Sequence, residues 1–422
     1  MRLIDRKITI NLNKFVIILF ILSLFHPLFG LIFYIGSLKL VQKEKIIGAI
    51  KYMLIVTMRG ILSIKTGVSL GNLDTIKLVF IIVLSLYILK YTFYNIKLQS
   101  FKSIFFCVIF FCVYVSIVSF ISGSYPIVST FKVWSFGLNF VAMLYGVYYT
   151  RERIHWINYM FHVLTPFFVI SFLVIPFESF RIINNNFQGV FNHVNMMGIM
   201  GAIYISVLLN IEENKRIMYN ILIAITLYMQ YLTASRTGLF VSIFIISIHY
   251  FINLNIKKMV FFLITMTLLA AVYYINPTIK NLIGNEIRSY IYKGNENDIL
   301  ASRREVGEKS QKKFESNELI GSGFMVPFDK NIKDYNLNMS IIYEPGNLFW
   351  ELLGGVGIIG LFLFFLFILV IILNGYINYI SLILTAIGIC LGEMVIFSIN
   401  NMAILLYMLI GIYLIKEKKV SS

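Results

Sequence analysis

Long apolar segments recur along the whole chain, and short polar links separate most of them. They lie near residues 15–38, 46–64, 75–92, 103–121, 131–149, 157–176, 190–210, 216–233, 235–252, 258–275, 347–373, 376–394 and 395–415. Each is close to the ~20 residues that an α-helix needs to cross ~30 Å of hydrocarbon. Because a helix satisfies its own backbone hydrogen bonds in lipid, the pattern predicts an all-α polytopic membrane protein.

The number of crossings depends on three places in this pattern. Segment 46–64 is the weakest, because it contains Lys51 and Arg59. The first segment has basic residues at both ends and His26–Pro27 in its middle, which favours two short half-helices that form a hairpin. Only a tight turn is expected between the last two segments. We therefore predict 12–14 transmembrane helices.

Basic side chains orient the predicted helices. If the segments alternate, one side of the membrane receives Arg151 and Arg153, Lys215 and Arg216, Lys257 and Lys258, and the tail Lys416–Lys419. Short cytoplasmic loops are enriched in Lys and Arg, so this side is predicted to be the cytoplasm.

The opposite side then holds residues 177–189, the turn at Ala234–Thr237 and one long polar loop, 276–346. Within the loop, Ile299–Phe314 is predicted to form an amphipathic helix on the membrane surface. The chain is thus predicted to comprise an N-terminal transmembrane bundle (1–275), an extracytoplasmic loop (276–346), and C-terminal transmembrane helices with a short cytoplasmic tail (347–422).

Composition agrees with a membrane solvent. Hydrophobic residues make up 59% of the 422 residues and charged residues only 13%, whereas soluble domains carry about 25% charged residues. The net charge of +16 is explained by basic loops, and no DNA- or RNA-binding motif accompanies it, so nucleic acid is not an expected partner. Cys107, Cys112 and Cys390 lie in apolar segments without the spacing of a metal site or a disulfide framework.

A first polar cluster, Gln188–Gly198, opens a predicted helix at the outer face. It places His193 and Asn195 about one turn inside the membrane boundary, where polar side chains usually face a cavity or another helix. Both are therefore candidates for substrate binding. The alternative is a helix cap with a buried, hydrogen-bonded histidine.

A second cluster, Thr233–Gly238, forms the short turn between two predicted helices. The turn is too short to let Arg236 move far from the membrane boundary. A guanidinium keeps its charge and binds phosphate oxygens in a bidentate manner, so Arg236 is a candidate catalytic residue. The alternative is an interfacial arginine whose charge reaches water beside the helix.

The third cluster ends the long loop. It runs from Tyr343 to Glu351 and is followed by the glycine-rich stretch Gly354–Gly360. Glycines this dense at a helix entry allow close approach of a neighbouring backbone or a ligand. Earlier in the loop, Arg303 and Arg304 form a basic pair whose alternative role is a solvated face.

Two further cations lie within predicted helices, Arg59 and Lys132. Each could line a cavity or pair with a carboxylate to support the structure. With the three clusters they predict a cationic cavity that opens outward and suits a lipid-anchored pyrophosphate. No nucleotide-binding loop, His-Glu-x-x-His helix or Cys pair appears, so the expected chemistry uses neither a cofactor nor a metal.

At these clusters the chain resembles the O-antigen ligase/polymerase superfamily of bacterial membrane glycosyltransferases, which implies a GT-C-like fold. Five features of the family have counterparts here. They are a Gly-x-Phe-x-His-x-Asn entry to a helix, a Ser-Arg turn, an Arg in the long loop, a Gly-x-Gly turn, and a final Asn followed after nine residues by Gly-x-x-Gly. These counterparts are Gly189, Phe191, His193 and Asn195; Ser235 and Arg236; Arg303 or Arg304; Gly321 and Gly323; and Asn347, Gly357 and Gly360.

The chain departs from the family at one position. The family's His before the final Asn is Gly346 here. In the ligases of the family that His is tied to catalysis, so its absence favours a polymerase. Glu344 is the nearest substitute as a general base; it could equally cap the helix that begins near Asn347.

The resemblance implies a polysaccharide polymerase that joins polyprenyl-pyrophosphate-linked oligosaccharide repeat units at the outer face of a bacterial cytoplasmic (inner) membrane. The expected catalytic residues are Arg236, Arg303, Arg304 and Glu344. The expected substrate-binding residues are His193, Asn195, Asn347, Arg59, Lys132 and Tyr343.

Two alternatives remain open at this point. One is a ligase that transfers finished glycan to a lipid or protein acceptor, and the other is a flippase for lipid-linked oligosaccharides. Besides the glycan donors, expected partners are membrane lipids and a chain-length regulator and a flippase of the same pathway.

Overall fold

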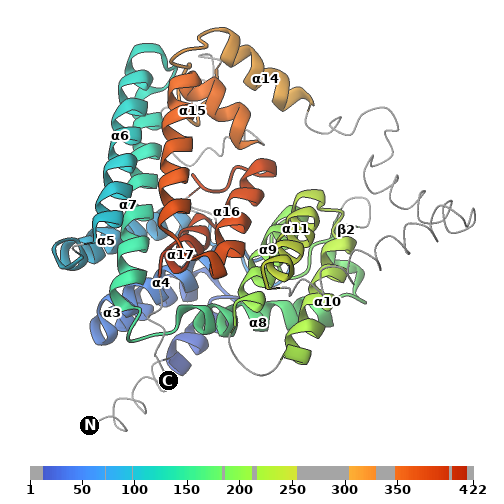
Figure 1. Cartoon of the computed structure of the whole chain (residues 1–422). Coiled ribbons are helices and arrows are strands. Elements are labelled where there is room, and N and C mark those ends of the chain that lie inside the picture. The colour runs from blue at the N-terminus through green and yellow to red at the C-terminus, as the bar shows by residue number, and fades with distance from the viewer. Residues whose placement is uncertain are drawn as a thin grey trace, which may run out of the picture.

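The structure is a computed structural model that describes residues 13–71, 73–96, 98–182, 186–211, 216–253, 304–328, 347–398 and 402–415. Helices make up nearly all of its regular structure (Figure 1). They are a short helix at Asn13–Leu22, α2 (Pro27–Ser37), α3 (Lys39–Glu44), α4 (Ile46–Gly60), α5 (Leu73–Thr92), α6 (Gln99–Ser122), α7 (Pro126–Thr150), α8 (Trp156–Leu173), α9 (Val194–Leu209), α10 (Arg216–Leu232), α11 (Arg236–Asn253), α14 (Arg304–Glu315), α15 (Leu348–Asn374), α16 (Ile380–Gly392) and α17 (Ala403–Tyr413).

Among the described residues, the other regular elements are short. They are the 3-10 turns η1 (Phe93–Asn95), η2 (Glu178–Phe180) and η5 (Ile377–Tyr379), and an antiparallel pair of two-residue strands, β1 (Arg181–Ile182) and β2 (Asn186–Phe187). An isolated bridge also joins Leu62 to Phe191, so the end of α4 lies beside the entry to α9.

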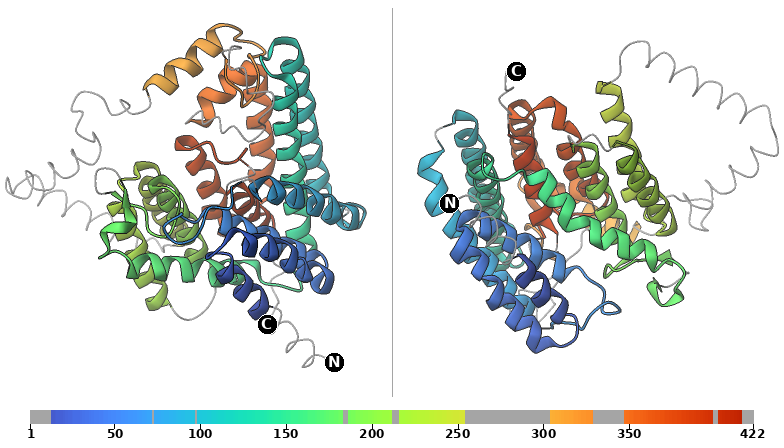
Figure 2. Two further views of the ribbon diagram at one scale, coloured as in Figure 1. Left: turned by 180° about the vertical axis from the view of Figure 1, so that it is seen from behind. Right: turned by 90° about the horizontal axis from the view of Figure 1, so that it is seen from below.

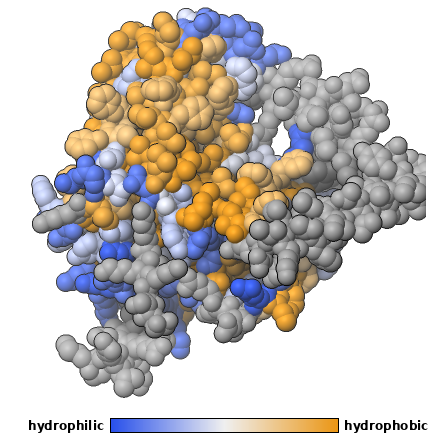
Figure 3. All heavy atoms as spheres, viewed as in Figure 1, coloured by the Kyte–Doolittle hydropathy of each residue, from blue (hydrophilic) through white to orange (hydrophobic). Residues whose placement is uncertain are grey.

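The protein is an all-α polytopic membrane protein, as predicted. In the part of the chain that the structure describes, five helices are long and apolar enough to cross a membrane: Ile76–Asn95, Gln99–Ser122, Pro126–Thr150, Trp156–Leu173 and Leu348–Asn374. Large apolar side chains cover the outward faces of α6 and α15, and the hydrophilic helix α14 lies at one end of this apolar surface (Figure 3). Lipid chains are the natural neighbours of such a surface.

Several local predictions hold in detail. The first apolar segment breaks as expected: one helix ends at Leu22, and α2 begins at Pro27 with His26 as its N-cap. The turn before Arg236 and the helix within the long loop, α14, are also present. The predicted segment 258–275 and the start of the Ile299–Phe314 helix lie outside the described residues.

Two predictions differ from the structure. Segment 46–64 forms only the 15-residue helix α4, because the chain after Gly60 pairs with the entry to α9. The expected tight turn between the last two segments is wrong, since residues 393–402 separate α16 from α17. The described part of this link, residues 393–398, stays inside the fold: Ile396 accepts a hydrogen bond from the buried Tyr407 hydroxyl, and the Phe397 ring lies 4.7 Å from that of Phe136.

The helices form two groups, and the single helix α16 connects them. α5, α6, α7, α15 and α17 pack together on one side, while α8, α9, α10 and α11 pack together on the other. α16 contacts α9 and α11 as well as α15 and α17, so it connects the groups. Figures 1 and 2 show this arrangement, with α8 running roughly across the direction of α6, α7 and α15.

Candidate functional site

Residues 318–323 of the long loop form backbone hydrogen bonds with the interrupted part of α15. Gly357 interrupts this helix with a φ of 67°, a left-handed conformation that glycine adopts readily. The interruption removes the helical bonds that would join residues 358 and 359 to residues 354 and 355. The loop replaces them: Ser322 and Gly323 donate to the carbonyls of Gly354 and Gly355 at 2.9 and 3.0 Å, and Glu318 and Leu319 accept from Ile358 and Ile359 at 3.0 and 3.2 Å.

The glycines make this close approach possible. Gly321 has a φ of 79°, and a Cβ there would overlap the backbone of Gly355. A Cβ on Gly357 would overlap the backbone of Leu319. The predicted close backbone approach at the glycine-rich helix entry is therefore present, and its partner is the chain's own loop.

A buried ion pair fixes the same loop, and we call Lys132, Lys313 and Glu351 the loop anchor. Lys313 Nζ lies 2.9 Å from Glu351 Oε1, and both side chains are 0% exposed. The same oxygen accepts from the Met325 N–H at 3.0 Å. Lys132 of α7 donates to the Met325 carbonyl at 2.7 Å. This cation, for which the sequence left a cavity role and a structural role open, therefore contacts the backbone of the loop.

The second carboxylate oxygen of the loop anchor is differently placed. Among the described residues, Glu351 Oε2 is buried without a hydrogen-bond partner. Lys132 and Lys313 act on this carboxylate electrostatically.

A second group of polar side chains lies where three helices begin, and we call His193, Asn195, Arg236, Asn347 and Glu393 the polar end cluster. His193 is the N-cap of α9, because its Nδ1 accepts from the Asn195 N–H at 3.1 Å. Its ring is exposed rather than buried. The Asn195 amide donates to Glu393 Oε1 at 2.9 Å, which joins the start of α9 to the end of α16.

Arg236 is the first residue of α11. The turn that precedes it is tight: Ala234 has a φ of 49°, and the Ser235 N–H donates to the Thr233 hydroxyl at 3.0 Å. The start of α11 packs directly on α9, because a Cβ added at Gly198 would overlap the Ser235 side chain. Arg236 is half-buried at this junction.

Asn347 caps the start of α15. Its Oδ1 accepts from the N–H groups of Phe349 and Trp350 at 2.8 and 3.3 Å, and its Nδ2 donates to the Leu391 carbonyl at 2.8 Å. The cap therefore comes from Asn347; Glu344, the alternative cap residue, lies outside the described residues.

Three consecutive residues bring the three helix starts together. Leu391 binds Asn347 of α15, and Glu393 binds Asn195 of α9. Gly392, between them, packs on Thr237 of α11, since a Cβ there would overlap the threonine side chain. The end of α16 thus joins the starts of α9, α11 and α15, which places all three sequence clusters at one end of the bundle.

Arg59 has a different environment. It is 3% exposed, and it donates to the Ser23 hydroxyl and to the carbonyls of Ser23 and Val68 at 3.0, 2.9 and 2.8 Å. These bonds tie together the break before α2 and the loop after α4. We assign Arg59 to the scaffold on the basis of these contacts.

Four further predicted site residues lie wholly or partly outside the described structure. Arg303, Tyr343 and Glu344 lie outside the described residues, and Arg304 is placed only as the first residue of α14. In the described part of the chain, no group of three or more His, Cys, Asp or Glu side chains could hold a metal ion.

Sequence reasoning gave Glu393 and Lys313 no role in the site. Glu393 carried a signal, a lone carboxylate near the end of an apolar segment, where charge is costly unless it has a partner. Lys313 carried none, because it is one of several lysines in a polar helix. Its partner Glu351 is 38 positions away.

A comparison with protein families finds a match within the chain. Residues 221–365 match the family model Wzy_C, described as O-antigen ligase. The match covers about a third of the chain. The match confirms the predicted superfamily, whose members are membrane glycosyltransferase-like enzymes that act on lipid-linked glycans. No curated protein matches the chain.

The matched range contains Arg236, Arg304 and Asn347 together with Lys313 and Glu351 of the loop anchor. The remaining contacts of the site come from elsewhere in the chain. Lys132, Asn195 and Glu393 lie outside the matched range, so the fold adds α7, α9 and α16 to it.

Proposed function

We propose that the protein is a polysaccharide polymerase that joins polyprenyl-pyrophosphate-linked oligosaccharide repeat units at the outer face of the cytoplasmic membrane. The convergence of three helix starts on Leu391–Glu393 carries this proposal. It gathers a guanidinium, a carboxylate and amide groups at one end of a membrane bundle. The match of residues 221–365 to the O-antigen ligase family model supports the same class of chemistry.

The transfer reaction needs stabilisation of a departing pyrophosphate. An acceptor hydroxyl oxygen attacks C1 of the donor sugar, the bond from C1 to the pyrophosphate oxygen breaks, and the polyprenyl pyrophosphate leaves with the bonding electrons. Arg236 would bind this leaving group at the N-terminus of α11, where the helix dipole also favours an anion. Arg303 or Arg304 of the long loop would supply further positive charge.

The proton of the acceptor hydroxyl needs a base, and the chain offers two carboxylates. Glu344 lies two residues before Gly346, the position of the family's histidine. Glu393 lies within the polar end cluster, where Asn195 orients its carboxylate. We propose that one of them accepts the proton, and that His193, Asn195, Asn347 and Tyr343 position the sugars.

A ligase is the second candidate, because the matching family model is described as O-antigen ligase. Both reactions break the same bond and differ only in the acceptor. Gly346 favours the polymerase, since the ligases of this superfamily use a histidine at that position. No comparison supports the flippase.

The membrane setting of the proposal follows from the basic loops. We propose that the polar end cluster and the long loop face the extracytoplasmic side of a bacterial inner membrane. A flippase and a chain-length regulator of the same pathway would then deliver substrate and limit the product.

Deletion of the gene, followed by gel analysis of the surface glycan, tests the proposal. Single-repeat product is expected for the loss of a polymerase. Full-length glycan that remains on its carrier would instead establish the ligase. Repeat units that never reach the outer leaflet would establish the flippase.

Complementation with variants then tests the site. Arg236→Ala is expected to lower polymer formation about 10²-fold or more, the size of effect seen when one electrostatic stabiliser is removed. Arg216→Ala, at the start of α10, is the matched control and is expected to retain activity. Equal activity of both variants, at equal protein levels, would exclude Arg236 from the reaction.

A further inference from the structure

A cavity of about 650 Å³ lies at the other end of the helix bundle from the polar end cluster. α15 runs from Asn347 in that cluster, through its interruption at Gly357, to Asn374 in the cavity wall. α6 and α7 likewise join the two ends: the links between them contact the long loop, while Ser100 and Arg151 line the cavity. The cavity volume lies within the range of small-molecule sites, about 300–1,000 Å³.

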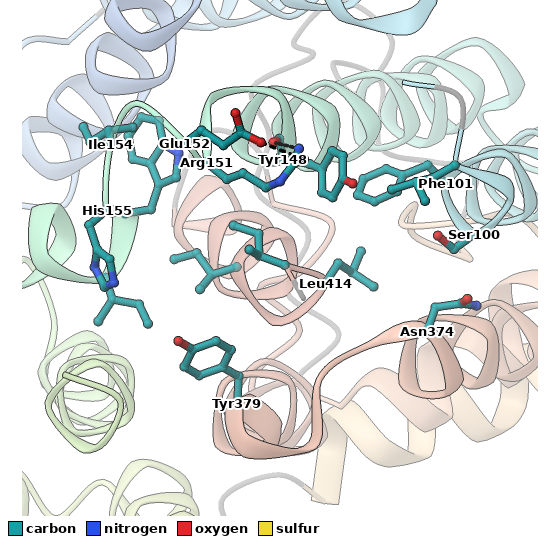
Figure 4. Close-up of a pocket in the computed structure, with 15 residues that line it drawn as sticks. Ser100, Phe101, Tyr148, Arg151, Glu152, Ile154, His155, Asn374, Tyr379 and Leu414 are labelled. Carbon is teal, nitrogen blue, oxygen red and sulfur yellow. Dashed lines mark hydrogen bonds and ion pairs between the residues drawn. The ribbon is translucent and has the colours of Figure 1, made fainter. Parts of the chain in front are cut away.

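One wall of the cavity carries two charged side chains, the Arg151 guanidinium and the Glu152 carboxylate. The Arg151 guanidinium stacks on the Tyr148 ring at 3.8 Å and donates to the Tyr148 carbonyl at 2.8 Å, which holds it in one position (Figure 4). Its other described contact is to the exposed Glu152, at 3.4 Å. A guanidinium has five N–H donors, so this contact set leaves donors for a ligand that enters the cavity. His155 lines the same wall.

The opposite walls are apolar or neutral. Leu414 of the α17 end and Asn374 and Tyr379 of the α15–α16 link face Arg151 across the cavity (Figure 4). An anion here would meet the fixed Arg151 guanidinium, the exposed Glu152 carboxylate beside it, neutral polar groups, and the apolar side chains of Ile412, Leu414 and Ile415. The sequence continues after Ile415 with Lys416, Lys418 and Lys419, which adds to the basic character of this end of the chain.

The surroundings favour a lipid over a soluble anion. Leu373 and Ile377, on either side of Asn374, are 72% and 56% exposed, and Leu98 on the cavity rim is 43% exposed. These side chains continue the apolar surface of α6 and α15. A phospholipid could therefore place its acyl chains against this surface and its phosphate beside Arg151.

We propose that this cavity binds the phosphate headgroup of an anionic phospholipid from the leaflet opposite the polar end cluster, with Arg151 as the phosphate ligand. In the predicted orientation this is the cytoplasmic leaflet, where anionic headgroups bind basic pockets between membrane helices. The site is separate from the glycan chemistry. A lipid bound in this cavity would contact the ends of α7, α15 and α17.

The test is lipid binding to the purified full-length protein, measured by native mass spectrometry in detergent. Dioleoylphosphatidylglycerol is the probe, and dioleoylphosphatidylcholine and inorganic phosphate are the comparison ligands. Arg151→Ala is expected to weaken phosphatidylglycerol binding about ten-fold, the loss of one charge-assisted bond. Arg153→Ala is the matched control, because Arg153 is exposed, two residues away and outside the cavity.

A second variant protects the test from a folding defect. Asn374→Trp fills the cavity while it leaves the guanidinium in place, and it is expected to weaken binding as Arg151→Ala does. The proposal is wrong if Arg151→Ala and Arg153→Ala bind phosphatidylglycerol equally, or if phosphatidylcholine binds as tightly. It is also wrong if inorganic phosphate displaces the lipid at similar concentration, because the occupant would then be a soluble anion.

Discussion

The loop anchor and the polar end cluster both lie near the start of α15, but their charged and polar side chains differ in burial and in the partners that they contact. In the loop anchor, Lys313 and Glu351 are fully buried and meet each other and the backbone of residues 325 and 326. In the polar end cluster, His193 is exposed, and Arg236 and Asn195 are half-buried at helix starts.

This difference separates structural charges from charges that a substrate can reach. A buried ion pair recovers its desolvation cost only through protein partners, so its side chains have little capacity for a ligand. Polar groups at exposed helix starts keep access to the surface while their backbone positions are fixed by caps. Charge within an apolar sequence therefore marks a functional site only when the fold leaves it accessible.

Breaking the loop anchor should have the largest effect on stability. Glu351→Ala leaves Lys313 buried without its counter-ion, which is expected to cost about 3–5 kcal/mol of stability. Thermal unfolding of the detergent-purified protein measures the loss. Lys312→Ala, at an exposed position on the same helix, should change the midpoint little.

A double replacement sharpens this test. Lys313→Met with Glu351→Leu removes both charges and should recover a large part of the lost stability, because apolar side chains can replace a buried ion pair. If Glu351→Ala were as stable as Lys312→Ala, the pair would not hold the loop.

Disturbing the loop's entry into α15 should have a smaller effect. Gly321→Ala adds a Cβ at positive φ against the Gly355 backbone, and about 1–3 kcal/mol of destabilisation is expected. Gly307→Ala is the control, because a Cβ there meets nothing within 4 Å in α14. It should stabilise that helix by up to about 1 kcal/mol. Opposite signs for the two variants in thermal unfolding are the expected result, and equal signs would contradict the loop's close fit.

The smallest effect on stability is expected in the polar end cluster. Asn347→Ala removes the N-cap of α15 and should cost about 1 kcal/mol. Asn347→Asp keeps the cap acceptor and loses only the bond to the Leu391 carbonyl, so it should unfold nearer to the wild type. If Asn347 also positions substrate, as proposed, both variants should lower polymer formation more than their stability loss explains. Normal polymer length in both would limit Asn347 to capping.

The sequence predicted the elements whose signals are local. Apolar length predicted helices such as α6 and α15, Pro27 marked the break before α2, and the glycines at 321 and 357 marked turns and close approach. The family resemblance located Arg236 and Asn347 at helix starts, where the structure places them. These predictions succeed because hydrophobic length and backbone preference act over a few residues.

Tertiary structure alone decided how these elements meet. Asn195 and Glu393 are 198 positions apart, and Lys313 and Glu351 are 38 apart, so no local pattern links either pair. The sequence left open whether Lys132 and Arg59 line a cavity or support the structure, and only the fold shows that both donate to loop backbone carbonyls. Burial of a charge in apolar surroundings is costly, and the fold determines whether protein or substrate provides its counter-charge.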